Sequence, residues 1–216
     1  MITLAPSLPP ATVRRVVLTL PAIAPDLLLR LQKYRNPLAA PDAIREAAAA
    51  AAHQATRLVS PRAVIWRGGI TALDAGGRIT LAGPHEFRSR LLARVLSSSA
   101  DAYVVVLTIG DALERRVDAL FRQHCALEGL LLDTAGWAAI VLLTRRLRRR
   151  LRDDERRAGR SVTHRVGPGH GDWPLDEQAA LLRVFGDVPL PVTVTESSLM
   201  LPRKSVSAVF GVVPAA

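Results

Sequence analysis

The stretch from residue 165 to residue 211 constrains the fold of this 216-residue chain more than any other. Its first half reads RVGPGHGDWPLDEQAALL, a loop rich in glycine and proline that runs into a predicted helix. Asp172 suits the N-cap of that helix, and Pro174 suits its first turn, where an amide hydrogen has no intrahelical partner. The closely spaced glycines leave bare backbone that a ligand can approach. The loop therefore predicts a binding site built partly from main chain, at Gly167, Gly169 and Gly171.

The second half of the stretch predicts two strands around a turn. Residues 192–195 alternate apolar and polar side chains, as a half-buried strand does. Residues 206–212 place Val206, Ala208 and Phe210 on one face. Glu196 directly follows the first strand, where a side chain can reach a neighbouring loop. We therefore expect a final hairpin packed beside the glycine loop.

Strands and helices interleave irregularly along the chain, which predicts a mixed α and β class around one sheet. We expect a proline-rich arm over residues 1–12 and one domain over residues 13–216. Apart from the final hairpin, strands are predicted near residues 13–20, 63–66, 79–81 and 102–108, and helices near residues 27–33, 42–58, 88–97, 111–124 and 127–157. The longest apolar stretch, residues 130–143, is shorter than the about 20 residues of a membrane span. A buried helix, without membrane association, is the expectation.

The charge is concentrated near the end of that long helix. The formal net charge is +10, and residues 145–160 read RRLRRRLRDDERRAGR. Three interpretations stay open: a solvated helix end, a docking face for an acidic protein, and a nucleic-acid site. The last has least support, because aromatic residues make up only 4% of the chain and none interleave with the arginines. We therefore expect no nucleic-acid partner.

The sequence contains no pattern typical of a catalytic or metal centre. Its single cysteine, Cys125, excludes an internal disulfide and a multi-cysteine zinc site, and it indicates a reducing, cytoplasmic compartment. The five histidines lack the spacing of metal ligands. Neither a Gly-x-Ser-x-Gly nucleophile elbow nor a phosphate-binding P-loop is present. We assign no catalytic residue and no metal ligand.

Two motifs in order carry a family resemblance. The run RVGPGHGDWPLDEQ, followed by TESSLMLPRKSVSAVFG, resembles the C-terminal activation (reactivation) domain of cobalamin-dependent methionine synthase, above all its free-standing versions. TIGDALERRV and LLLDTAGWAAI are similar to that family as well. The resemblance covers the second half of the chain. It implies a single α+β domain with a largely antiparallel, twisted sheet packed with helices.

The resemblance also implies a ligand, S-adenosylmethionine. Arg165 would hold the ligand's carboxylate, and the backbone of Gly167, Pro168 and Gly169 would meet the ligand closely. His170 stands where the family carries tyrosine. Glu196 would either receive the ligand's amino group or satisfy loop amides. Cobalamin would be present only through a partner protein, because the chain has no Asp-x-His-x-x-Gly element.

Two functions follow as alternatives. The first is reductive methylation or reactivation of a separate corrinoid protein, with methyl transfer from S-adenosylmethionine as the possible enzymatic step. The partners implied are a corrinoid-binding or methionine synthase-like protein and a flavodoxin-like electron donor, and the chain itself could form a homo-oligomer. The second is a noncatalytic subunit or assembly module that has lost the ligand, which the histidine at position 170 favours.

Overall fold

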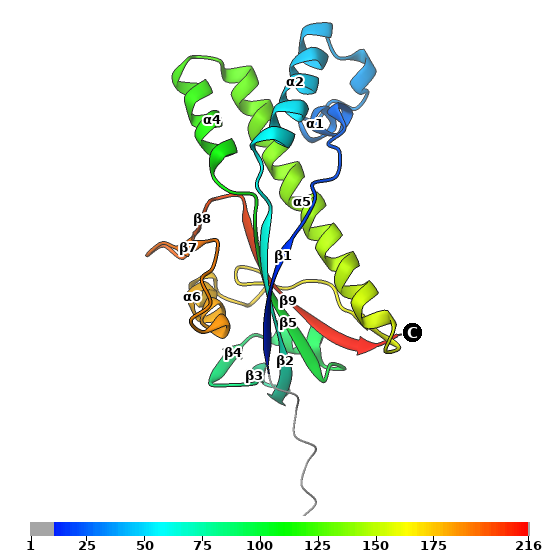
Figure 1. Cartoon of the computed structure of the whole chain (residues 1–216), viewed down its shortest axis with the longest axis vertical. Helices are drawn as coiled ribbons and strands as arrows, with labels where there is room; N and C mark the ends of the chain where they lie inside the picture. Colours follow the sequence, from blue (N-terminus) through cyan, green and yellow to red (C-terminus); the bar gives the residue numbers. More distant parts are fainter. Residues whose placement is uncertain (1–10, 216) are drawn as a thin grey trace, which may run out of the picture.

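The computed structural model describes residues 11–215, which form a seven-stranded antiparallel sheet packed with helices and a separate two-stranded ribbon (Figure 1). The seven strands of the sheet are β1 (Thr12–Val17), β2 (Arg62–Leu73), β3 (Arg78–Leu81), β4 (His85–Arg88), β5 (Asp101–Thr108), β6 (Arg160–Val162) and β9 (Ser205–Pro214). Their order is β4-β3-β2-β5-β9-β6, and β1 also pairs with β2. Every pairing is antiparallel. The predicted α+β class with an antiparallel sheet is confirmed.

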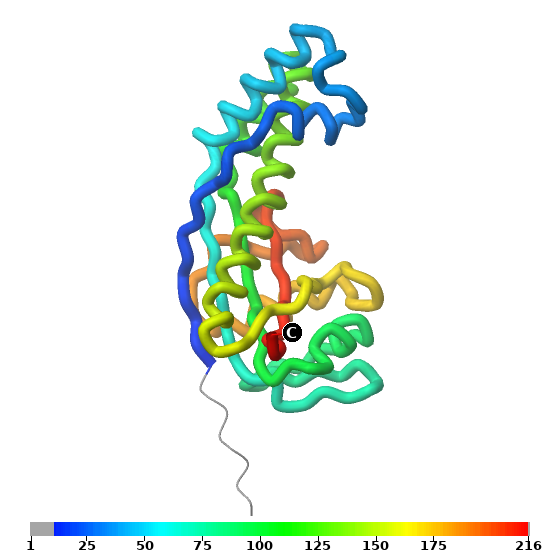
Figure 2. The backbone as a smooth tube through the Cα atoms, turned by 90° about the vertical axis from the view of Figure 1, so that its right-hand side faces the viewer, coloured from blue at the N-terminus to red at the C-terminus, as the bar shows by residue number. Residues whose placement is uncertain are grey.

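The helices lie in two groups. At one end of the elongated molecule, α1 (Pro25–Leu31), α2 (Asp42–Leu58) and α4 (Ala112–Arg122) gather around the beginning of α5 (Ala126–Arg156). From there α5 runs back alongside the sheet. Strand β1 pairs antiparallel with β2 and leads up to the helical end (Figure 2). The short helices α3 (Arg90–Leu96) and α6 (Gln178–Leu182) pack on the sheet away from this helical end. The long helix thus connects the helical end with the sheet.

Each face of the sheet has its own hydrophobic core, and strand β5 contributes to both. Tyr103, Val105 and Leu107 point into the core beneath α1, α2, α4 and α5. Val104 and Val106 point into the opposite core. Because alternate residues of a strand face opposite sides, a strand covered on both faces needs a continuous apolar run. This double burial explains the sequence AYVVVLT.

One face of α5 is buried along its whole length. The buried stripe repeats every three or four residues through Leu143, Leu147 and Leu151. The helix is long and apolar enough to cross a membrane by length and composition, but 56% of its most apolar window is buried inside the fold. A core helix of a globular domain has this same character, so the composition of α5 is weak support for a membrane span.

A buried carboxylate ties the end of α5 to the sheet. Glu155 is 3% exposed and accepts hydrogen bonds from Tyr103 Oη at 2.5 Å and from Arg160 Nε at 2.6 Å. Arg67 Nη2 lies 3.3 Å from the same carboxylate and 3.0 Å from Asp101. Burial alone raises the pKa of Glu155, but these hydrogen bonds and the two arginine charges outweigh it and hold the pKa below its ordinary value. Strands β2, β5 and β6 are therefore clasped to the helix.

The last strands of the chain pair differently from the prediction. The predicted final hairpin of residues 192–195 with residues 206–212 is wrong, because β7 (Thr193–Val194) pairs with β8 (Met200–Leu201) in a separate ribbon, while β9 lies between β5 and β6. The long strand finds two partners in the main sheet and buries both faces there, which a local hairpin could not provide. The predicted arm lies outside the described residues except for Ala11 and Thr12, and Thr12 already belongs to β1.

Candidate functional site

The glycine loop is held against strand β9. Val166 and Val209 exchange backbone hydrogen bonds of 3.0 and 2.7 Å, which makes a bridge at the edge of the sheet. Next to this bridge, a Cβ atom on Gly167 would lie 2.7 Å from the carbonyl oxygen of Ser207. Close approach to the strand therefore requires glycine at position 167, whatever ligand the loop binds.

Beyond Gly167 the loop closes on itself. The backbone nitrogen of His170 donates to Gly167 O at 3.1 Å, and that of Gly169 donates to Trp173 O at 2.8 Å. Gly169 and Gly171 have φ values of 87° and 60°, in the left-handed region that favours glycine. The His170 ring also folds back, with Nδ1 donating to Gly167 O at 2.9 Å. The loop is thus organised by its own hydrogen bonds.

Asp172 caps a different helix from the one predicted. Its carboxylate accepts hydrogen bonds from Ser89 Oγ at 2.7 Å, Arg90 N at 2.7 Å and Leu91 N at 3.1 Å, all at the beginning of α3. The bonds from Ser89 and the two amides lower the pKa of Asp172 to about 2. The prediction of a cap for the following helix was wrong, because tertiary folding brings the loop to free amides 82 residues away in sequence.

Two adjoining cavities form a groove beside this loop. The loop-side cavity has a volume of about 420 Å³ and the α5-side cavity about 530 Å³. Both are lined by Arg165, Arg203, Ser205 and Val206, so they meet at the beginning of β9. The loop-side cavity is lined further by Pro168, His170, Leu175, Gln178, Ser198, Leu199, Met200 and Ser207. The α5-side cavity is lined further by Trp137, Ile140, Val141, Thr144, Arg145 and Lys204.

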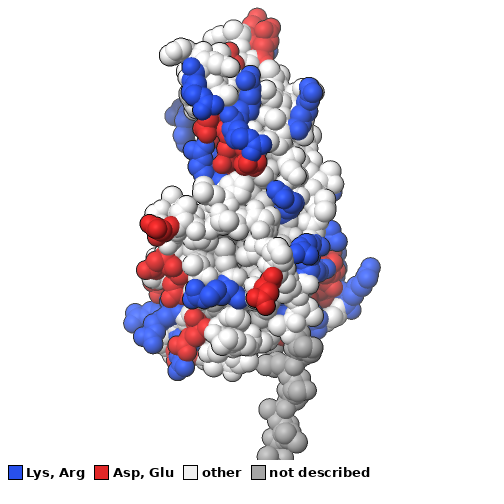
Figure 3. Space-filling model, turned by 60° about the vertical axis from the view of Figure 1, so that its left-hand side comes forward, with Lys and Arg blue, Asp and Glu red and all other residues white. Residues whose placement is uncertain are grey.

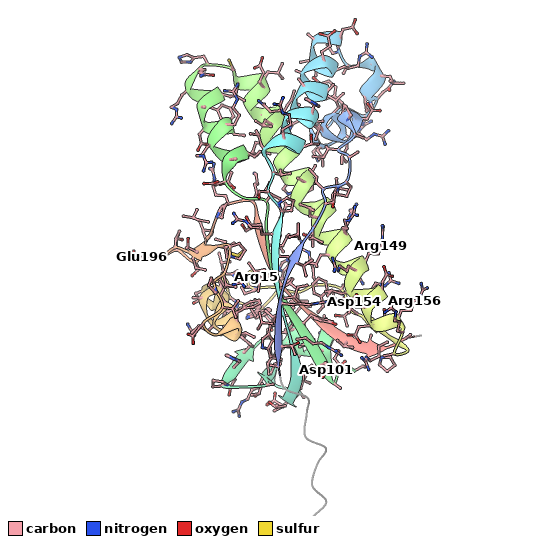
Figure 4. All side chains as sticks on the ribbon, in the orientation of Figure 1. Arg15, Asp101, Arg149, Asp154, Arg156 and Glu196 are labelled. Atoms are coloured by element: carbon pink, nitrogen blue, oxygen red, sulfur yellow. The ribbon has the colours of Figure 1, made fainter. Side chains whose placement is uncertain are left out.

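The structure brings together part of the predicted site. Arg165, Pro168 and His170 all line the loop-side cavity. Gly167 and Gly169 belong to the same loop but do not line the cavity. Glu196 is exposed on the outer turn between β7 and β8, pointing away from the rest of the molecule (Figure 4). Its neighbours Ser198, Leu199 and Met200 line the cavity, so the ribbon of β7 and β8 reaches the groove although Glu196 itself does not line it.

The groove is lined by cations and, among residues 11–215, by no carboxylate. Arg203 pairs with Asp118 at 3.2 Å, and Lys204 pairs with Asp133 at 2.8 Å, which neutralises part of the charge from outside the lining. In the described part of the chain, Arg145 and Arg165 form no ion pair. Two forked guanidinium groups are therefore free to bind an anion.

Sequence reasoning missed Gln178. Its side chain is 2% exposed, and Oε1 accepts a hydrogen bond from Ser207 Oγ at 2.9 Å. Nε2 is buried and has no hydrogen-bond partner within residues 11–215, although Gln178 lines the loop-side cavity. A buried donor without a partner carries a free-energy cost, so this amide is suited to an acceptor atom of a ligand. Its place at the end of the RVGPGHGDWPLDEQ run was the available signal.

The groove offers several kinds of contact to a bound molecule. Within the described residues, no group of three or more histidine, cysteine, aspartate or glutamate side chains could hold a metal ion. The side of the molecule that carries α6, β7 and β8 shows charges gathered toward its two ends, with a largely uncharged surface between them (Figure 3). The arrangement offers guanidinium groups, one amide donor and apolar walls to a bound molecule.

Comparisons with known proteins support the fold. No family model and no curated protein matches the sequence. Among solved structures, the chain is similar to a crystal structure of the MetH reactivation domain bound to AdoHcy, with a TM-score of 0.64 and 15% sequence identity. The match covers 95% of this chain and 79% of that one. At this identity the likeness shows a shared fold, which agrees with the architecture implied by the sequence motifs.

Proposed function

We propose that the loop-side cavity binds S-adenosylhomocysteine or S-adenosylmethionine, and that the protein supports reductive methylation of a separate corrinoid protein. The observation that carries this proposal is Arg165. It lies where the two cavities meet, is exposed, and forms no ion pair within residues 11–215. The resemblance assigns the ligand's carboxylate to this position. The shared fold with a domain solved in complex with AdoHcy is consistent with the assignment.

The residues present fit most of such a ligand. Arg165 suits the carboxylate, because a guanidinium can bind both oxygens through parallel hydrogen bonds. Gln178 Nε2 is a buried donor without a partner and suits an acceptor on the ligand. Leu175, Leu199 and Met200 supply apolar surface for the adenosine part. No carboxylate among the described residues lines the groove to balance a sulfonium charge, so we expect neutral AdoHcy to bind more tightly than cationic S-adenosylmethionine.

The role of the chain in this proposal is positioning. S-adenosylmethionine would supply a methyl group on its sulfonium, while the partners would be a corrinoid-binding protein and a flavodoxin-like electron donor. Arg165 and Gln178 would fix the ligand's orientation, and the loop would shield one side of it from water. No proton transfer is assigned to a residue of the groove.

Calorimetry on the whole chain tests ligand binding. We expect AdoHcy and S-adenosylmethionine to release measurable heat at millimolar concentration, and Arg165→Ala to weaken binding by about 2–3 kcal/mol, the scale of a charge-assisted pair. Arg146→Ala is the matched control, because Arg146 is also an exposed arginine but lies outside both cavities. No heat with either ligand on folded wild-type protein would refute the proposal.

A second candidate is an assembly module that no longer binds the ligand. It is favoured by His170, whose ring is bonded to Gly167 O within the loop, and by Glu196, which lies outside the groove lining. This candidate predicts association with a corrinoid protein that is indifferent to AdoHcy. Calorimetry with AdoHcy on the folded chain separates the candidates, since only the first binds the ligand.

A further inference from the structure

A cavity between α5 and the end of β1 lies apart from the groove of the proposed function. It has a volume of about 410 Å³, within the range of about 300–1,000 Å³ typical of small-molecule sites. One wall is formed by residues 17–19, and the other by Arg146, Arg149, Arg150 and Asp153 of α5. None of these residues lines the groove. We propose that this β1-side cavity is a second binding site, for a small molecule that carries two or more adjacent phosphate groups.

Three arginines of α5 supply the positive charge of the β1-side cavity. Arg149 and Arg150 lie three and four positions after Arg146, so the three side chains share one side of the helix. All three are exposed, and none forms an ion pair within residues 11–215. Forked guanidinium groups bind phosphate oxygens through charge-assisted hydrogen bonds. The cavity therefore presents three guanidinium groups to a phosphate compound.

The stability of α5 does not account for these three arginines. The helix dipole favours a cation only in the last turn, which in α5 contains Arg156. Arg146, Arg149 and Arg150 lie ten, seven and six residues before it. Like charges three and four positions apart destabilise a helix. The three arginines therefore carry a cost for the helix that a bound anion would remove.

The neighbouring acids of α5 leave these arginines uncompensated. Asp154 pairs with Arg14 of β1 instead of with an arginine of its own helix. Asp153 lines the β1-side cavity but forms no ion pair in the part of the chain that the structure describes. The lining thus carries three positive charges and one negative charge. A di- or triphosphate, which bears several negative charges on adjacent groups, matches this excess better than a single carboxylate does.

The dimensions of the β1-side cavity suit a short phosphate chain. Arg146 and Arg150 are separated by about 6 Å along the helix axis, because each residue adds about 1.5 Å. Two or three linked phosphates span a similar length, so each guanidinium group can bind its own phosphate. On the other wall, Thr19 is exposed, and its hydroxyl group can donate a hydrogen bond to a phosphate oxygen. The end of β1, which carries this wall, passes beside α5 (Figure 2).

The proposed site is narrower than the arginine-rich surface of α5 as a whole. Arg149 and Arg156 both lie on the outer side of α5 (Figure 4), but Arg156 and Arg152 line a different cavity at the end of the helix. Arg152 and Arg156 are exposed and four positions apart, as Arg146 and Arg150 are, and they form no ion pair among residues 11–215. An acidic protein or a nucleic acid would contact both pairs, whereas a small phosphate compound fits one cavity. The second pair is therefore a matched control for the first.

Calorimetry on the whole chain, with tripolyphosphate as the probe, tests the proposal. We expect saturable binding at low ionic strength that weakens with added salt, because exposed charges are screened. Arg146→Gln combined with Arg150→Gln should weaken binding by about ten-fold or more, whereas Arg152→Gln combined with Arg156→Gln should change it by less than about three-fold. Both double variants remove the same charge from the same helix. Circular dichroism confirms that each variant is folded.

Asp153→Asn should change the affinity in the opposite direction. It removes the only carboxylate among the described residues that line the cavity, so tripolyphosphate should bind about two- to five-fold more tightly. A parallel titration with ATP identifies the source of the phosphate chain, and both of its results support the site. Equal affinity means that the phosphates alone are recognised. Tighter ATP binding that is lost in the Arg146→Gln, Arg150→Gln variant means that the ligand is a nucleotide.

Three results would overturn the proposal: no saturable heat with tripolyphosphate, equal losses in the two double variants, or no gain from Asp153→Asn. Equal losses would show a diffuse attraction of anions to α5 and would favour an acidic protein or a nucleic acid as the partner of this surface. The titration with AdoHcy depends on Arg165, which lies outside the β1-side cavity. The proposed function and the phosphate site can therefore fail independently.

Discussion

Replacing Glu155 by glutamine tests how strongly the buried carboxylate holds α5 to the sheet. Glutamine keeps the size and shape of the side chain but removes its charge. Tyr103 could still donate a hydrogen bond to the amide oxygen. Arg160 Nε and Arg67 Nη2 would instead lose a negatively charged acceptor that now lies 2.6 and 3.3 Å away. The variant therefore isolates the charge of Glu155 from its packing.

The magnitude follows from the surroundings of the two arginines. A hydrogen bond between a charged donor and acceptor contributes about 1.5–3 kcal/mol, and breaking a fully buried pair costs about 3–5 kcal/mol. The side chains of Arg67 and Arg160 are 32% and 41% exposed, and Arg67 keeps Asp101 at 3.0 Å. Water and Asp101 offset part of the loss. We therefore expect Glu155→Gln to lower the free energy of unfolding by about 2–3 kcal/mol.

Urea unfolding near neutral pH measures this difference, with Glu86→Gln as the control. Glu86 pairs with Arg78 at 2.8 Å on the surface, where removing the charge should cost at most about 1 kcal/mol. In thermal unfolding, each kcal/mol should appear as a shift of about 2–4 °C for a chain of this size. If the free energy of unfolding of Glu155→Gln lies within about 0.5 kcal/mol of wild type, the charge of Glu155 does not hold α5 to the sheet.

The stability difference between wild type and Glu155→Gln should also depend on pH. The pKa of Glu155 in the folded protein is held below its ordinary value of 4.5, so its contribution to stability is fully present above 4.5. It is lost as the pH falls through the lowered value of the folded state. The difference in unfolding free energy between wild type and Glu155→Gln should therefore be constant at neutral pH and shrink in acid. A difference that grows in acid would contradict the sign of this shift.

Three further predictions concern the glycine loop. Asp172→Asn should lower the thermal stability near neutral pH, and because the folded pKa is about 2 against an ordinary 3.8, the difference from wild type should disappear as the pH falls toward 2. Gly167→Ala should destabilise the protein by about 1–3 kcal/mol in urea unfolding, because its Cβ would lie 2.7 Å from Ser207 O. As the control, Gly76→Ala should change the free energy of unfolding by less than about 0.5 kcal/mol, because its Cβ would meet mainly the flexible end of a side chain. His170→Tyr should bind AdoHcy at least as tightly as wild type in calorimetry, and the absence of binding in both proteins would favour the assembly module.

Elements whose signal is local could be predicted well from the sequence. Helix α2 ends at Leu58 as predicted, because an alanine run has high helix propensity and a proline follows closely. Asp42, predicted as its cap, is instead its first residue, and the N-cap is Pro41. Strand β5 could be predicted because its apolar run is unbroken, and it begins at Asp101, one residue before the predicted start. Helix α5, at Ala126–Arg156, differs from the prediction by one residue at each end.

Elements that depend on a distant partner could not be predicted. Strands β4 and β6 were missed, since they are only four and three residues long and exist through pairing with β3 and β9. The pairing of β9 was wrong for the same reason. A short segment carries little periodicity, so its state is decided by the strand edge that tertiary folding offers to it.

The sequence by itself determined the class of the fold, the long buried helix and the loop with Arg165, because hydrophobic periodicity and glycine–proline patterns act over a few residues. Only the tertiary structure decided what these parts do together. It turned Asp172 toward α3, placed Glu196 outside the groove and brought Arg165 into the same cavity as Trp137 and Arg145 of α5. The physical reason is that a cap, a groove and a pair of cations are defined by distances between elements, and those distances are set when the two cores pack on the sheet.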